Sequence, residues 1–195
     1  QKNTGYDTRG TKIRISRKLS DQVNLILGLQ QNFMDDVPRT HKTVDGLNWE
    51  GLSHGREIWR RLDQYRSLYY GRITWEDIEG LANSGQFTMS LHTHEQERNR
   101  MKGSSGIATG GDLQSFYLDD FGLSARFEKD DFLGGSLSYG TEWHHENMDS
   151  GGYKFDANVN RTTDLAQGPL AADAIYDRFA TYIQYKHEFD SGWSL

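Results

Sequence analysis

The chain has 195 residues, among them 22 Lys and Arg, 28 Asp and Glu and no Cys, and its formal net charge is -6. Without cysteine there is no disulfide framework and no thiol nucleophile, and the negative charge argues against a nucleic-acid partner. The sequence has no run of about 18 apolar residues, so it predicts no transmembrane helix. The low mean hydropathy does not exclude a membrane β-barrel, because apolar and polar residues alternate in the strands of such barrels.

The two ends of the sequence suggest a piece of a longer protein. Residue 1 is Gln and no apolar signal segment follows it, while residues 192–195 (GWSL) come just after a turn, where another strand is expected to begin. We therefore expect targeting information to lie outside residues 1–195.

Apolar residues recur at every second position in segments of about ten residues, which predicts strands with one apolar face. In the clearest segment, Leu137, Tyr139 and Trp143 alternate with small or polar residues. In chain order the predicted strands lie around residues 12–16, 23–30, 69–76, 87–94, 117–128, 133–144 and 179–186. The sequence thus predicts an all-β protein with seven strands and the start of an eighth.

Predicted connections alternate between short and long. The short ones are 20–22, 77–84, 129–131 and 190–192, and the long ones are 35–60, 102–112 and 149–175. In consecutive antiparallel strands this alternation places all short turns at one end, as in an outer-membrane barrel. A lipocalin-like barrel with one open mouth is the soluble alternative. Residues 55–64 are a candidate for a short helix inside the first long connection.

Aromatic residues cluster near the predicted short turns, where Trp75, Phe87 and Phe127 lie, and Tyr117 and Trp143 lie at the far ends of their strands. A membrane barrel has such aromatic girdles at both interfaces. The alternative is that these are core aromatics of a soluble β-domain. We favour an antiparallel transmembrane β-barrel, present in part, in which residues 1–195 supply seven to eight strands of a larger barrel.

Four strings resemble TonB-dependent outer-membrane receptors, and at the level of the barrel the resemblance covers nearly the whole chain. They are residues 30–40 (QQNFMDDVPRT), 139–143 (YGTEW), 168–176 (GPLAADAIY) and 179–184 (FATYIQ). Residues 36–39 (DVPR) are similar to the haem or haemoglobin branch.

The resemblance implies a plugged barrel in the outer membrane of a Gram-negative-type bacterium. Its surroundings would be lipid and lipopolysaccharide. Its transported ligand would be a ferric siderophore, haem or another scarce nutrient, and its energy would come from the TonB complex acting through a plug. The plug, the TonB box and the closing strand are missing from residues 1–195.

Three histidines are candidate ligand-binding residues, since His92, His94 and His144 fall on the polar faces of predicted strands. Imidazole binds haem iron and other transition metals well. Hydrated polar groups that tune a wet lumen are the alternative interpretation.

A second candidate group belongs to the first long connection and the strand that follows it. It consists of Arg39, His41, Arg56, Arg60 and Arg61. Guanidinium groups suit anionic ligands such as haem propionates or ferric catecholates. Lipopolysaccharide phosphates, or neutralisation by nearby acidic residues such as Glu57 and Asp63, are the alternatives.

The sequence contains no His-Glu-x-x-His and no Gly-x-Ser-x-Gly motif. We therefore expect no catalytic residues, no resident metal or cofactor, and no enzyme. The expected function is TonB-dependent uptake of an iron-containing nutrient, ferric siderophore or haem. The alternatives are a passive or structural, porin-like outer-membrane barrel and a soluble ligand-binding β-barrel.

Overall fold

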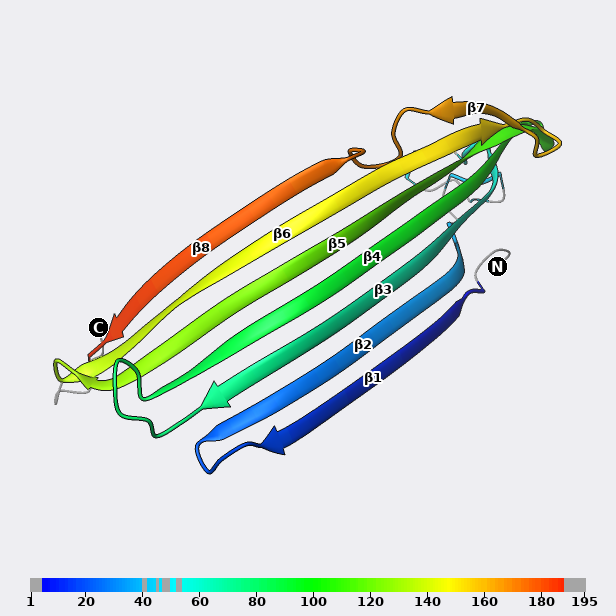
Figure 1. Ribbon diagram of the computed structural model, residues 1–195. Coiled ribbons are helices and arrows are strands. Elements are labelled where there is room, and N and C mark those ends of the chain that lie inside the picture. The colour runs from blue at the N-terminus through cyan, green and yellow to red at the C-terminus, as the bar shows by residue number, and fades with distance from the viewer. Residues whose placement is uncertain (1–4, 40–41, 45, 47–49, 52–53, 188–195) are drawn as a thin grey trace.

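The computed structural model describes residues 5–39, 42–44, 46, 50–51 and 54–187 (Figure 1). These residues form eight strands and no helix, which confirms the all-β prediction. The strands are β1 (Asp7–Lys18), β2 (Val23–Pro38), β3 (Glu57–Trp75), β4 (Ser84–Ser104), β5 (Ile107–Phe132), β6 (Gly135–Phe155), β7 (Arg161–Leu165) and β8 (Ala174–Lys186). No helix that is long and apolar enough to cross a membrane occurs in this part of the chain.

Seven of the eight strands correspond to the seven predicted segments, and β7 is the additional one. The strand expected to begin at residue 192 lies outside the described residues.

All strands belong to one antiparallel sheet, in which β1 to β6 follow one another in chain order. β6 carries two partners on its far edge, because β8 pairs with residues 136–148 and β7 with residues 152–155. Figure 1 shows the strands side by side in a single layer, with β1 at one edge and β8 at the other. As described, the sheet has two open edges and is not closed into a barrel.

One face of the sheet is apolar across its whole width. Residues directly opposite one another in antiparallel strands point to the same face, and one such row runs through Leu27, Gly71, Met89, Leu123, Trp143 and Phe179. We call the rows from Leu29 and Tyr69 to Val23 and Trp75 the apolar belt. The alternation predicted from the sequence therefore continues from strand to strand in register.

The opposite side of the sheet, here the polar face, carries the intervening residues. One of its rows contains Gln30, Leu68, His92, Asp120, Glu146 and Tyr176, and the next contains Gly28, Tyr70, Ser90, Gly122, His144 and Arg178. The three predicted histidines therefore lie on one face.

The described strands enclose almost no core. Met101 and Phe155 are their only buried apolar side chains, whereas Met89 and Ile183 of the apolar face are 50% and 75% exposed. The accessible surface is 13440 Å², compared with about 9,400 Å² for a compact globular protein of this mass. The apolar face thus lacks a covering layer in this part of the chain.

The strands extend further than the sequence predicts, so several predicted connections are wrong. β4 and β5 meet at a two-residue turn, Ser105 and Gly106, where a long connection over 102–112 was expected. The first long connection shrinks from 35–60 to 39–56, and residues 57–64 are strand rather than the expected short helix. The strict alternation of short and long connections therefore fails at the β4–β5 turn.

The predicted turn at 129–131 is also displaced. Residues 129–131 belong to β5, which has an irregular register between Lys129 and Phe132. The turn consists of Leu133 and Gly134, with φ angles of 52° and 80°. Two positive φ angles are typical of the type I′ turn that closes tight hairpins.

Candidate functional site

The first two predicted histidines lie next to each other on β4. The ring centroids of His92 and His94 are 6.5 Å apart and their planes differ by 21°. His94 also packs edge-on against Phe116, with 4.9 Å between centroids. The amide nitrogen of Gln64 lies 2.9 Å from Nε2 of His94. β3 and β5 therefore hold the His94 ring on both sides.

The third predicted histidine has a carboxylate partner. Nδ1 of His144 is 2.8 Å from Oδ1 of Asp120, and Asp120 is the direct cross-strand partner of His92. No group of three His, Asp or Glu side chains in the described part of the chain is arranged to hold a metal ion. The histidines share a face but do not converge on one point.

The structure separates the two adjacent predicted arginines. Successive residues of a strand point to opposite faces, so Arg60 lies on the polar face, 3.9 Å from Glu57. Arg61 lies on the other face, 3.1 Å from Oδ1 of Asp36 and 5.8 Å from the ring centroid of Trp59. These two candidate residues therefore lie on opposite faces of the sheet.

The remaining predicted loop residues lie at the ends of strands. The amide of Arg39 donates to the carbonyl of Arg60 at 3.1 Å, and the carbonyl of Arg56 accepts from the amide of Gly103 at 2.8 Å. His41 falls outside the described residues.

Around Arg60 the polar face carries an ion-pair network that sequence reasoning missed. Asp112 lies at its centre, with Oδ1 2.9 Å from Nη2 of Arg98, and Oδ2 2.5 Å from Nη2 of Arg100 and 3.6 Å from Nζ of Lys102. We call the following residues of β3, β4 and β5 the arginine cluster: Glu57, Arg60, Arg98, Arg100, Lys102 and Asp112.

Cations outnumber carboxylates in the arginine cluster, since only Glu57 and Asp112 oppose its four basic side chains. Both carboxylates are buried, with 9% and 8% of their side chains exposed. Oε2 of Glu57 and Nε of Arg98 are buried and have no hydrogen-bond partner among the described residues. The cluster therefore has a net positive charge and incomplete hydrogen bonding.

The acidic centre of the cluster is held ionised. Burial by itself raises the pKa of Asp112, but hydrogen bonds and charges from Arg100 and Arg98 outweigh it and lower that pKa. Burial and the neighbouring cation Arg39 lower the pKa of the Arg60 guanidinium. Arg100 lies about 30 Å along β4 from Leu91, which belongs to the first row of the apolar belt, the row of Leu29 and Tyr69, so the cluster is well outside the belt.

A sequence signal for this cluster exists. Arg98, Arg100 and Lys102 alternate with other residues, a spacing that places three cations on one face of a strand. The sequence nevertheless does not predict the arginine cluster, because residues 102–112 are expected to form a loop, and a loop does not fix which side chains share a face.

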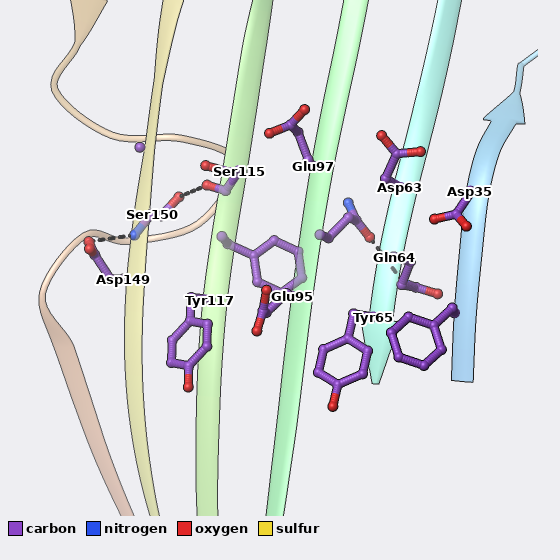
Figure 2. Close-up of a pocket in the computed structure, with 14 residues that line it drawn as sticks. Asp35, Asp63, Gln64, Tyr65, Glu95, Glu97, Ser115, Tyr117, Asp149 and Ser150 are labelled. Carbon is purple, nitrogen blue, oxygen red and sulfur yellow. Dashed lines mark hydrogen bonds between the residues drawn. The ribbon is translucent and has the colours of Figure 1, made fainter. Parts of the chain in front are cut away.

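Beyond the belt, the other face of the sheet carries a pocket of opposite character. Figure 2 shows carboxylates from several strands around this pocket, with Tyr65 and Tyr117 at one side. The pocket has a volume of about 430 Å³. The rings of Phe33 and Tyr65 are 4.7 Å apart. The acidic lining residues are Asp35, Asp63, Glu95, Glu97 and Asp149.

The acidic lining is itself electrostatically strained. Burial, and then the nearby charge of Asp63, raise the pKa of Glu97. Like charges opposite one another on paired strands repel, and Asp63 and Glu97 are direct partners. This pocket therefore disfavours anionic ligands, whereas the arginine cluster on the polar face favours them.

No protein-family model matches the chain, and a search of curated proteins returns no match.

Proposed function

We propose that this chain is part of a transmembrane β-barrel of the outer membrane, whose apolar belt faces lipid and whose polar face lines a wet lumen. The observation that carries the proposal is the single-layer sheet with one continuous, uncovered apolar face. Antiparallel strands of membrane barrels alternate in this way between lipid and lumen.

The spacing of aromatic residues supports this assignment. Tyr65 and Trp75 lie on the apolar side of β3, and Tyr117 and Phe127 on the same side of β5. Each pair is separated by about ten residues, the length of a strand that crosses a bilayer, about 9–11 residues. Aromatic girdles of a barrel have this separation.

We further propose that the barrel takes up an iron-containing nutrient, a ferric siderophore or haem, in a TonB-dependent manner. The arginine cluster supports an anionic ligand, because guanidinium groups bind carboxylates and catecholates through charge-assisted hydrogen bonds. The stacked pair His92 and His94 adds imidazoles on the same face. The resemblance of four strings to TonB-dependent receptors supports the energy source.

The test uses the full-length protein in its native outer membrane. A strain that lacks it is supplied with haem or a ferric siderophore as the sole iron source, and growth and ligand binding are compared with those of the complemented strain. Arg60→Gln, and His92→Gln combined with His94→Gln, are expected to weaken binding several-fold. Arg14→Gln, on the polar face of the edge strand β1, is the control and should leave binding unchanged.

Two outcomes would overturn the proposal in favour of another function. TonB-independent, ohmic conductance in planar bilayers would indicate a passive channel. A sharp folding transition of the monomer without detergent would indicate a soluble ligand-binding protein.

A further inference from the structure

At the end of the apolar face where β1–β2, β3–β4 and β5–β6 are connected, the β3–β4 connection forms the wall of a groove. Residues 76–83 reach from β3 toward β5 and β6 (Figure 1), and the hydroxyl of Tyr139 donates to the carbonyl of Leu81 at 3.2 Å. The amide of Asn83 also donates to the carbonyl of Glu128 at 2.8 Å. The connection is thereby fixed against strands beyond its own hairpin.

The groove has a volume of about 680 Å³ and is mainly apolar. Leu81 forms one wall and Leu137 and Ile183 form the floor. The side chains of Leu81 and Ile183 are 91% and 75% exposed. Tyr139 belongs to the last row of the apolar belt, so the groove continues the surface that the proposed function assigns to lipid.

A single cation stands at this groove. Lys129 is the direct partner of Leu137 across β5 and β6, which places it on the apolar face. It alone is charged among the described residues that line the groove, and its side chain has no hydrogen bond or ion pair with any described residue. The neighbouring carboxylate of Glu128 is engaged by Arg126.

We propose that this groove binds one anionic glycerophospholipid, with an acyl chain along Leu81, Leu137 and Ile183 and its phosphate at the ammonium group of Lys129. The inference rests on the proposed membrane orientation, in which short turns face the periplasm. Lysine at a bilayer edge extends its stem along apolar surface and its charge toward the headgroups. An apolar groove with one cation that has no partner among the described residues is complementary to a lipid that has one negative charge.

The test is native mass spectrometry of the full-length protein in non-ionic detergent, titrated with phosphatidylglycerol or zwitterionic phosphatidylcholine. The wild type should bind phosphatidylglycerol about fivefold more tightly. Lys129→Gln should abolish this preference, and Leu81→Ser should weaken the binding of both lipids. Lys12→Gln, which removes a lysine from the polar face, is the matched control and should behave as the wild type.

If Lys129→Gln still binds phosphatidylglycerol more tightly than phosphatidylcholine, the proposed lipid site is wrong. Displacement of bound lipid by millimolar glycerol 3-phosphate would also overturn it, because it would show that the phosphate binds without the chain. Failure of the site is distinguishable from failure of the proposed function. If Lys129→Gln keeps both nutrient uptake and the lipid preference of the wild type, only the proposed lipid site is wrong. If the wild type folds without detergent, the proposed membrane location is itself wrong.

Discussion

The ring of Tyr70 on β3 covers the backbone of Gly28, its direct partner on β2. A Cβ at Gly28 would lie far inside van der Waals contact of the Tyr70 ring atoms. Gly28 is therefore required by the close approach of an aromatic ring. Aromatic side chains that cover glycines of a neighbouring strand help to fix the register of a sheet.

Gly28→Ala is expected to lower the free energy of unfolding by about 1–3 kcal/mol, the usual cost of overpacking, because Tyr70 must leave its position. The measurement is urea unfolding of the full-length protein in lipid vesicles, followed by tryptophan fluorescence. Gly71→Ala is the matched control, since its Cβ would meet only a side-chain carbon of Leu27 at 3.6 Å. Equal effects of the two variants would contradict the packing argument.

Asp112→Asn should destabilise the part of the sheet beyond the belt, because it leaves Arg98 and Arg100 without their shared carboxylate. We expect a loss of about 1–3 kcal/mol, below the full cost of breaking a buried pair because the arginines are partly exposed. Glu128→Gln breaks the exposed pair with Arg126 on the same strand and should cost less than about 1 kcal/mol. Hydrogen exchange of the β4 and β5 amides measures the loss of stability in both variants. A larger loss in Glu128→Gln than in Asp112→Asn would contradict the stabilising role of Asp112.

The same carboxylate predicts a pH dependence. The pKa of Asp112 is lowered in the folded state, so its contribution to stability is complete above the ordinary carboxylate pKa of about 3.9. That contribution declines as the pH falls through the lowered pKa of the folded state. The difference in unfolding free energy between wild type and Asp112→Asn should therefore be constant near neutral pH and shrink in acid. A difference that grows on acidification would show the opposite sign.

The turn between β5 and β6 allows a test of backbone conformation. Leu133 has a φ angle of 52° and an 81% exposed side chain, and asparagine adopts this conformation more readily than leucine does. Leu133→Asn should stabilise the hairpin by up to about 1 kcal/mol, and Leu133→Val should destabilise it by about 1 kcal/mol, because β-branched residues disfavour positive φ. Thermal unfolding of the full-length protein ranks the three. Equal midpoints for the Asn and Val variants would refute the argument.

The sequence predicts the strands within the apolar belt but not their continuation beyond it. Within the belt, Met89 and Leu91 of β4 alternate with polar residues, and the period of two is visible. Further along the same strand, Glu97 faces the acidic pocket and Arg98 faces the arginine cluster. Both faces are charged there, so hydropathy no longer alternates although the backbone pairing continues.

For the same reason, the sequence predicts which candidate side chains share a face only where its period of two is visible. His92, His94 and His144 share the face that period two assigns to them. Arg60 and Arg61 belong to the group predicted in the first long connection and the strand that follows it, and as successive residues of β3 they lie on opposite faces. Asp112 could not be placed, because its role depends on a β4–β5 register that no local pattern in the sequence specifies.

The central claim is that one face of the sheet contacts lipid and the other contacts water. Residues 1–195 contain no cysteine, so within this part of the protein single spin labels can be introduced at Ile73 on the apolar face and at Thr74 on the polar face. In the full-length protein reconstituted in liposomes, the label at 73 should be accessible to oxygen and protected from a water-soluble nickel chelate. The label at 74 should show the reverse, because a wet lumen admits the chelate. Equal access of the nickel chelate to both labels would contradict the membrane-spanning sheet.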